Sequence, residues 1–400
     1  MSASTEPNES APYERPRRGG PVTFAELTAG LIWPLILRAP ALALQPARMI
    51  IAALLILLMW GVAAAVDRAV GAVTGNPIAL PFILTIRDAW RSGAALMLEG
   101  RPAEALAALW RGEIASTITL VTERPISLGA ALLALTPLWA IGTGAIARGA
   151  AVDFAAGLNL GTRESLRFAL ARWRGLAGAM LLPLLAAAAL ALVLIVGGWI
   201  TLAIPGLNVV GAGLFGVLLL VVGLPLTLLL ALYALGHGLL APAVAVEATD
   251  SADAVQRVYA YLLGRPARAL LYIGLLIAQG LIIVGLVGWL ASTVWSLTDA
   301  LAGAWLGEVR RFEVLGATSA PLAATTTPAG GASAAGRVIA FWKLVLEGAA
   351  LAYIVSWSAC CSTIVYLLLR RVNDEQDIHE VWLPGVIPGT QSAQRQQTTA

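Results

Sequence analysis

A long segment of this chain, residues 175–246, contains no Asp, Glu, Lys or Arg. A helix that crosses a lipid bilayer needs about 20 predominantly apolar residues, so this segment is long enough for two such helices. A Pro-Gly pair at Pro205 and Gly206 divides the segment near its middle and is typical of a turn, which we expect at residues 204–208. The segment therefore predicts a transmembrane hairpin.

The composition of the whole chain supports the same class of protein. Hydrophobic residues make up 59% of the chain and charged residues only 12%, with a mean hydropathy of +0.82. Soluble domains carry about 25% charged residues. This chain therefore has too few charges to cover the surface of a soluble protein of the same length. We expect an integral membrane protein.

Four further segments meet the same length criterion, at 49–66, 126–147, 269–296 and about 348–369. Six spans in total predict an all-α fold, a polytopic membrane helix bundle over residues 23–371. An even number of spans places both termini on one side of the membrane.

The distribution of basic residues predicts which side that is. With the N-terminus inside, more than half of the 26 Lys and Arg residues fall on the inner side, as the positive-inside rule requires. We therefore expect a multi-pass protein of the cell inner (plasma) membrane with a cytoplasmic N-terminus and C-terminus. Residues 1–22 are polar and Pro-rich and predict a disordered cytoplasmic tail, and residues 372–400 predict a cytoplasmic C-terminal tail.

A short helix-like segment precedes each outward-going span. Thr162 and Ser251 can cap such helices before the third and fifth spans, and the residues from Thr23 to Glu26 form a capping-box pattern before the first span. The pattern predicts a threefold helix-hairpin repeat with units 23–160, 161–246 and 247–371. The alternative is that these segments are only the helical ends of long spans.

These short helices are expected to be cytoplasmic interfacial helices, with an apolar face toward the membrane and Arg side chains reaching anionic lipid phosphates. The residues predicted to contact the lipid interface are Arg163, Arg167, Trp173, Arg174 and Arg257. The apolar stripes that would face the lipid are Leu166, Leu170 and Trp173 in the second unit, and Val255, Val258 and Leu262 in the third.

The two long outer loops differ in composition. Residues 67–125 have mixed charges and contain helix-like pieces at 87–98 and 102–110. Residues 316–336 are rich in Ala, Thr, Pro and Gly and predict a flexible linker.

Three polar residues within or beside the predicted spans are candidates for function, because ionisable groups inside a membrane are costly. His237 lies near the inner end of the fourth span, and a hydrogen bond to a carbonyl of a neighbouring helix is its favoured role. Gln279 lies in the middle of the fifth span, where a hydrogen bond between helices is again the default. Glu347 stands four residues after Lys343 at the outer edge of the sixth span, where interfacial snorkelling explains both side chains.

Two pairs of residues have both a functional and a structural interpretation. Pro183 and Pro225 would kink the third and fourth spans, and paired broken helices can mark a transport site. Neither proline has charged neighbours, which favours structural kinks. Cys360 and Cys361 could form a thiol site or a lipidation point, but burial at a helix-packing seam is favoured.

Several kinds of chemistry lack their residues in this sequence. There is no HExxH motif, no Cys/His spacing for zinc, no paired carboxylates in a span and no Gly-rich phosphate-binding loop. We therefore predict no catalytic, cofactor-binding or metal-binding residues and no cofactor. Basic clusters with interleaved aromatic residues are also missing, so nucleic acid is not an expected partner.

The last third of the chain resembles a loose group of uncharacterised bacterial multi-pass membrane proteins, and is similar to the membrane domain attached to some glycerophosphodiester phosphodiesterases. The resemblance implies six helical spans and no established activity, and the phosphodiesterase catalytic domain itself is not part of it. The residues that carry it are Ala245-Val246-Glu247, Ser251-Ala252-Asp253-Ala254-Val255, Tyr261, Leu263, Arg265-Pro266 and the closing run from Thr363 to Arg370.

Three functions remain open. The first is a non-enzymatic component that organises membrane lipids or other membrane proteins. The alternative is a transporter or permease for an apolar or lipid-like solute, which needs few buried charges. An enzyme is third, because it would require His237 to approach Glu347 or a carboxylate of an outer loop.

Overall fold

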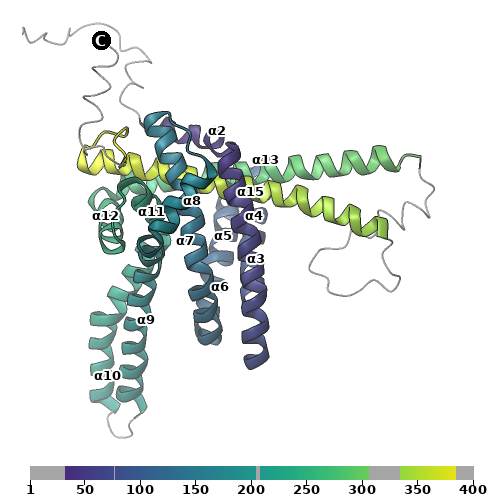
Figure 1. Ribbon diagram of the computed structural model, residues 1–400. Helices are drawn as coiled ribbons and strands as arrows, with labels where there is room; N and C mark the ends of the chain where they lie inside the picture. The colour runs from purple at the N-terminus through teal and green to yellow at the C-terminus, as the bar shows by residue number, and fades with distance from the viewer. Residues whose placement is uncertain (1–31, 76, 204–207, 306–333, 384–400) are drawn as a thin grey trace, which may run out of the picture.

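The computed structural model describes residues 32–75, 77–203, 208–305 and 334–383, and within these ranges it contains helices and turns but no strand (Figure 1). The predicted all-α fold is confirmed. In chain order the helices are η1 (Trp33–Arg38), α2 (Ala39–Ala43), α3 (Pro46–Thr74), α4 (Ala79–Leu98), α5 (Pro102–Leu109), η2 (Trp110–Ala115), α6 (Ser116–Glu123), α7 (Pro125–Ala156), α8 (Thr162–Ala171), α9 (Trp173–Ala203), α10 (Asn208–Leu218), η3 (Leu219–Gly223), α11 (Leu224–Glu247), α12 (Ser251–Gly264), α13 (Pro266–Gly303) and α15 (Ala334–Asp374).

Six helical segments among the described residues are long and apolar enough to cross a membrane, which confirms a polytopic membrane helix bundle. They are Pro46–Val73, Pro125–Ala156, Trp173–Leu202, Val210–Glu247, Pro266–Gly303 and Arg337–Asp374. The third and fourth of them occupy the uncharged segment, and residues 204–207 of the turn predicted between them lie outside the described residues.

The first span is longer than the sequence indicates, because the charges at its end do not stop the helix. We expected the span to end at residue 66, before Asp67, but α3 continues to Thr74. The carboxylate of Asp67 accepts hydrogen bonds from the backbone N–H groups of Ile78, Ala79 and Leu80, at 2.7–2.9 Å. Asp67 therefore caps the start of α4 and is stabilised where it lies.

The fourth span contains a π-helical turn at the predicted proline kink. Pro225 lies in the first turn of α11, directly after the π-helical η3. Proline has no backbone N–H to donate to the preceding turn, which accounts for the change of helical register at this point. Pro183, by contrast, lies inside α9, which is assigned as one continuous α-helix.

Three hairpins, formed by α3 with α7, α9 with α11, and α13 with α15, diverge from one packed region that we call the hub (Figure 1). The hub consists of α2, α8, α12 and the adjoining ends of the six long helices. It holds most of the fully buried large side chains, among them Leu176, Leu240, Tyr366 and Leu369. In Figure 1 the first two hairpins run downward from the hub, whereas α13 and α15 run to the right.

The short helices pack around the hub in a cyclic order. Each one lies against the returning helix of the unit before it: α8 against α7, α12 against α11, and α2 against α15. Ser356 of α15 donates a hydrogen bond to the carbonyl of Ala43 in α2, at 2.9 Å. A Cβ on Gly236 of α11 would lie only 3.0 Å from Leu262 Cδ1, so glycine permits the close approach of α12.

The three returning helices also end alike. A residue in the left-handed conformation follows each of them: Gly157 after α7 (φ 67°), Ala248 after α11 (φ 54°) and Glu375 after α15 (φ 58°). The repeat hypothesis describes a unit of short helix, outgoing span, outer loop and returning span. The left-handed residue after each returning helix is a further similarity that the hypothesis did not include.

The predicted first outer loop is a set of helices, α4, α5, η2 and α6. The two helix-like pieces expected at 87–98 and 102–110 correspond to α4 and α5. They pack against the middle of α13, where Gly93, Leu109 and Leu281 meet. The first loop thus joins the first hairpin to the third.

Parts of the predicted organisation fall outside the described residues. These are the N-terminal tail with the capping box at 23–26, nearly all of the 316–336 linker, and the C-terminal tail beyond residue 383. The described beginning of that tail, residues 375–383, lies against the hub: Trp382 N–H donates to the carbonyl of Val246 at 2.9 Å, and Val381 is buried.

The apolar stripes of the short helices differ in what they cover. Val255, Val258 and Leu262 of α12 are all buried inside the hub, so this stripe contacts protein and the expectation that it faces lipid is wrong. Leu170 and Trp173 of the second unit, in contrast, are about half exposed. The physical reason is that α12 packs between α9 and α11, which leaves its apolar face no access to the membrane.

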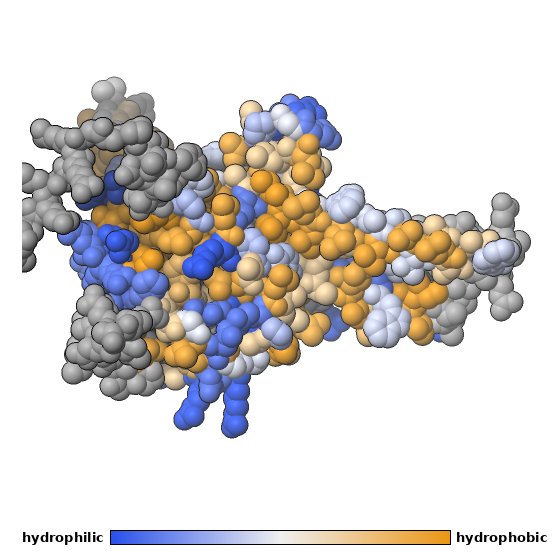
Figure 2. Space-filling model, turned by 90° about the horizontal axis from the view of Figure 1, so that it is seen from above, coloured by the Kyte–Doolittle hydropathy of each residue, from blue (hydrophilic) through white to orange (hydrophobic). Residues whose placement is uncertain are grey.

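The surface of the hub also differs in hydropathy from the surface of the arm formed by α13 and α15. Figure 2 shows most of the hydrophilic surface over the hub end of the molecule, whereas the arm formed by α13 and α15 is mainly hydrophobic. The exposed large apolar residues of that arm include Leu286, Trp289, Leu290, Phe341 and Trp342. Such a surface is suited to contact with lipid.

Candidate functional site

The hub contains several polar groups that are buried and fixed. The first of them is Arg48. This side chain is only 3% exposed, and its Nη2 lies 2.6 Å from Asp153 Oδ2 at the end of α7. Nη2 also donates to the carbonyl of Gly149 at 3.0 Å, and Gln45 donates to the same Asp153 oxygen at 2.9 Å. A buried cation is stable only when it is paired and hydrogen-bonded in this way.

A second network joins α11, α12 and α15. Glu247 pairs with Arg257 at 2.6 Å and with Arg370 at 3.6 Å, and accepts a hydrogen bond from Tyr366 at 2.9 Å. Burial alone would lower the pKa of Arg257, but its hydrogen bonds to Asp253 and the charge of Glu247 raise it overall. Arg257 is therefore a fixed cation held by protein carboxylates.

Tyr261 of α12 completes this network by donating to Asp374 at the end of α15. Burial raises the pKa of Tyr261 above its ordinary value, and the neighbouring carboxylate of Asp374 raises it further. The phenol stays protonated at neutral pH and acts as a donor that joins the third short helix, α12, to the last returning helix, α15.

Arg148 is buried without a carboxylate partner among the described residues. Its guanidinium donates to the carbonyls of Ala245 at 3.0 Å and Trp382 at 2.7 Å. The ring centroids of Phe168 and Trp382 lie 4.7 and 5.4 Å from its central carbon, so two aromatic faces compensate part of the charge. Arg148 thus fixes the C-terminal segment 375–383 to α7, α8 and α11.

A hollow of about 460 Å³ opens beside this cluster, where the turn between α8 and α9 meets the turn between α11 and α12. Residues 170–175 and 249–251 line it. We call it the hub hollow. Arg172, Trp173 and Arg174 supply two cations and an aromatic ring, and Asp250 is the carboxylate in the lining.

The charges of the hub hollow are not balanced. Asp250 accepts a hydrogen bond from the backbone N–H of Asp253, at 2.9 Å, as the cap of α12. Arg172 donates to the carbonyl of Ala248 and lies over Trp382, and Arg174 lies over the ring of Trp173, with no carboxylate partner for either among the described residues. The Oγ1 atom of Thr249 is buried and has no hydrogen-bond partner in the described structure. The hollow therefore offers positive charge and hydroxyl groups, which is the chemistry that binds a phosphate or carboxylate.

The residues predicted for the lipid interface separate into three groups. Trp173 and Arg174 line the hub hollow. Arg163 and Arg167 are exposed on α8, where they are free to reach a membrane surface. Arg257 is instead engaged in two ion pairs, so its cation is already neutralised within the protein.

The three predicted intramembrane polar residues do not come together. His237 is exposed, and its Nδ1 lies 3.0 Å from the carbonyl of Ala234 in its own helix, rather than from a neighbouring helix as expected. Glu347 is exposed on α15. Gln279 makes the expected contact between helices, because its Oε1 accepts hydrogen bonds from Trp357 at 3.3 Å and from Cys361 at 3.4 Å.

Sequence reasoning missed four arginines of the hub: Arg48, Arg148, Arg172 and Arg370. Arg48, Arg148 and Arg370 each directly flank a predicted span, yet each is less than 5% exposed. A usable signal exists for Arg48 and Arg370, since carboxylates, Asp153 and Glu247, lie close to the ends of other predicted spans. Arg148 has no such signal, because its partners are carbonyls and rings from distant segments.

No group of His, Cys, Asp and Glu suited to a metal ion occurs in the described ranges. Comparisons of the chain with models of protein families, with curated proteins and with solved structures give no match. The resemblance of the last third of the chain to bacterial multi-pass membrane proteins therefore stays a prediction.

Proposed function

We propose that this protein is a non-enzymatic component of a bacterial inner membrane that gathers anionic phospholipid at its hub, with both termini in the cytoplasm. The observation that carries the proposal is the hub hollow, in which Arg172, Trp173 and Arg174 lie together beside the start of a membrane-spanning helix. The packed hub holds these residues in place, and the proposed ligand is an anionic phospholipid of the surrounding membrane.

The position of the hub hollow supports a lipid headgroup as the ligand. Trp173 is the first residue of α9, and its ring is 48% exposed. Tryptophan at the end of a membrane helix is characteristic of the headgroup layer, where one side of the ring is apolar and the other is wet. The two arginines beside it are thus at the depth of the lipid phosphates.

The N-terminus of α9 adds to the attraction. The first residues of α9 line the hollow, whereas the start of α12 is already capped by the carboxylate of Asp250. Backbone N–H groups at a helix start favour an anion, and the exposed cations of Arg163 and Arg167 raise the concentration of anionic lipid nearby.

The transporter alternative calls for a solvated cavity at the kinks near Pro183 and Pro225. The hub hollow is not lined by either proline. The mutually paired cations and carboxylates of the hub likewise favour a fixed scaffold over a proton relay.

The test compares two double variants with the same change of charge. Arg172→Gln with Arg174→Gln removes the cations of the hub hollow. Arg265→Gln with Arg268→Gln removes two exposed cations just before and within the start of α13, outside the hollow. Each protein is purified in a mild detergent and titrated with phosphatidylglycerol, and bound lipid is counted by native mass spectrometry.

We expect the hub-hollow variant to bind phosphatidylglycerol at least tenfold more weakly than the wild type, because charge-assisted hydrogen bonds are lost. The control variant should bind phosphatidylglycerol less than about threefold more weakly than the wild type, because exposed and screened cations outside the hollow contribute little. Equal losses of phosphatidylglycerol binding in the two variants would show that the lipid responds only to the general positive charge of the surface. That result would refute the proposal.

A further inference from the structure

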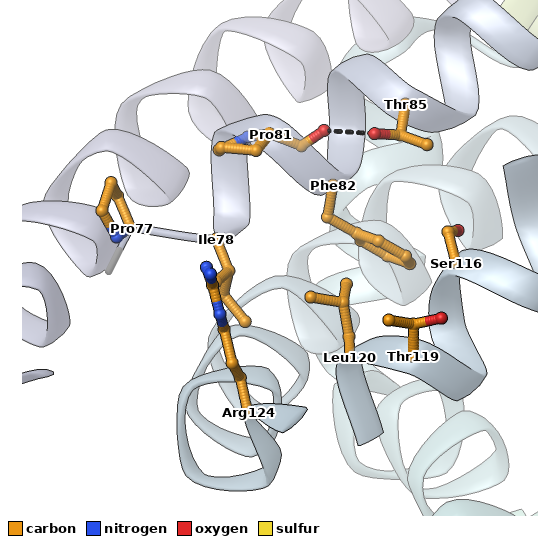
Figure 3. Close-up of a pocket in the computed structure, with 9 residues that line it drawn as sticks. All are labelled: Pro77, Ile78, Pro81, Phe82, Thr85, Ser116, Thr119, Leu120 and Arg124. Carbon is orange, nitrogen blue, oxygen red and sulfur yellow. Dashed lines mark hydrogen bonds between the residues drawn. The ribbon is translucent and has the colours of Figure 1, made fainter. Parts of the chain in front are cut away.

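A second hollow, of about 270 Å³, lies where α3 ends and α7 begins, at the end of the first hairpin that is remote from the hub. Figure 3 shows the residues that line it. Three parts of the chain line it: residues 77–85 at the start of α4, residues 116–120 of α6, and Arg124. Ile78, Phe82 and Leu120 give it an apolar wall. Figure 3 shows the side chain of Arg124 rising beside Ile78, with the ring of Phe82 facing Leu120.

Arg124 is the charged residue of this lining, and its charge is uncompensated. The side chain is half-buried and makes no hydrogen bond or ion pair within the described residues. The nearby carboxylate of Asp67 is already engaged by the three N–H groups at the start of α4. The hydroxyls of Thr85 and Ser116 donate to carbonyls of their own helices, so they offer only acceptor atoms to a ligand.

The depth of this hollow in the membrane follows from the length of α7. The helix begins at Pro125, and Arg148 of the hub lies 23 residues further along it, a distance of about 35 Å at 1.5 Å per residue. The hydrocarbon core of a bilayer is about 30 Å thick. Arg124 therefore lies at the membrane surface opposite the one that the hub adjoins.

We propose that this second hollow binds an amphiphile that carries one phosphate group, with the phosphate on Arg124 and the hydrocarbon chain along Phe82 and Leu120. A single cation beside an apolar wall fits a monoanionic phosphate with an attached chain better than a polyphosphate. The source of this chemistry is either a phospholipid of the opposite leaflet or a free single-chain phosphate. The site is separate from the hub hollow and does not depend on the function proposed for it.

The experiment titrates the full-length protein in a mild detergent with three probes: phosphatidylglycerol, dodecyl phosphate and glycerol 3-phosphate. Native mass spectrometry counts the bound molecules for the wild type, Arg124→Gln, Arg124→Lys and the control Arg111→Gln, whose exposed cation lies outside the hollow. We expect Arg124→Gln to weaken one binding event about tenfold, Arg124→Lys to retain most of it, and Arg111→Gln to leave it unchanged.

Phosphatidylglycerol bound in preference to dodecyl phosphate supports the proposal with the lipid as source, and the reverse order supports it with a soluble amphiphile as source. Glycerol 3-phosphate bound as tightly as either would overturn it, since the apolar wall would then contribute nothing. Equal binding by Arg124→Gln and the wild type, or equal losses in Arg124→Gln and Arg111→Gln, would also overturn it.

Phe82→Ala keeps every charge and tests the wall independently if Arg124→Gln fails to fold. It should weaken both amphiphiles severalfold and leave glycerol 3-phosphate unaffected, and unchanged amphiphile binding would count against the site. The double variant of Arg172 and Arg174 should bind the amphiphile at this hollow normally, so the two proposals can fail separately.

Discussion

The two ends of the fourth span, Val210–Glu247, use the same kind of residue for opposite purposes. From Leu239 to Val246, at the hub, every residue is buried against protein. At the other end of the same span, Leu219, Leu220, Leu224 and Leu228 are more than half exposed. Apolar residues therefore form a close-packed core at one end of the helix and a surface for lipid at the other.

The difference teaches that hydrophobicity alone does not report packing in a membrane protein. Within a bilayer there is no hydrophobic force between helices, because lipid tails are as apolar as leucine. The hub is held instead by close packing and by buried polar contacts such as those of Arg48 and Glu247. The outer halves of the three hairpins diverge from one another (Figure 1).

The largest effect is expected from breaking a buried ion pair of the hub. Arg48→Ala leaves Asp153 without its cation and should lower the free energy of unfolding by about 3–5 kcal/mol. Unfolding by SDS in mixed micelles, followed by circular dichroism, measures this loss. Arg163→Ala, on the exposed face of α8, is the matched control and should change stability by less than about 0.5 kcal/mol. A similar loss in both variants would mean that the hub network does not hold the fold.

The comparison within α11 can be tested directly with two leucines. Leu240 is fully buried, whereas Leu230 is 45% exposed. Leu240→Ala should cost about 2–5 kcal/mol because it leaves a cavity in the hub. Leu230→Ala should cost less than about 1 kcal/mol, because lipid or detergent fills the space. The same SDS titration measures both, and equal costs would show that the outer half of the helix is as closely packed as the inner half.

The smallest effects concern the left-handed residues after the returning helices, and they should have opposite signs. Gly157→Ala should destabilise the protein by about 1 kcal/mol, because a Cβ disfavours φ of 67°. Ala248→Gly should stabilise it by a similar amount, because it relieves the same conflict at φ of 54°. Thermal unfolding in detergent measures both shifts. Changes of the same sign would show that these two helix ends are not equivalent.

The spans were predictable from the sequence because length and the absence of charge decide them. Segment 175–246 needed no tertiary information, and the all-α fold followed from it. The predicted end of the first span was wrong because Asp67 accepts hydrogen bonds from the start of α4. The sequence alone does not show that contact.

The candidate site was predictable in part. Trp173 and Arg174 were found because an aromatic residue and a cation at a span boundary indicate the lipid interface. Arg257 and the stripe of α12 were assigned to lipid because amphipathic periodicity is the same whether the apolar face contacts lipid or protein. Arg148 and Arg172 were missed because Ala245, Ala248, Phe168 and Trp382, their partners, are distant in sequence.

The attachment of segment 375–383 to the hub has a consequence for how the protein is made. Arg370 donates to the carbonyls of Asp377 and Glu380, and Arg148 donates to that of Trp382. These carbonyls leave the ribosome only after all six long helices have been synthesised. Two buried cations therefore lack some of their hydrogen bonds until this segment has been translated, and the tight assembly of the three hairpins is completed only when segment 375–383 joins the hub.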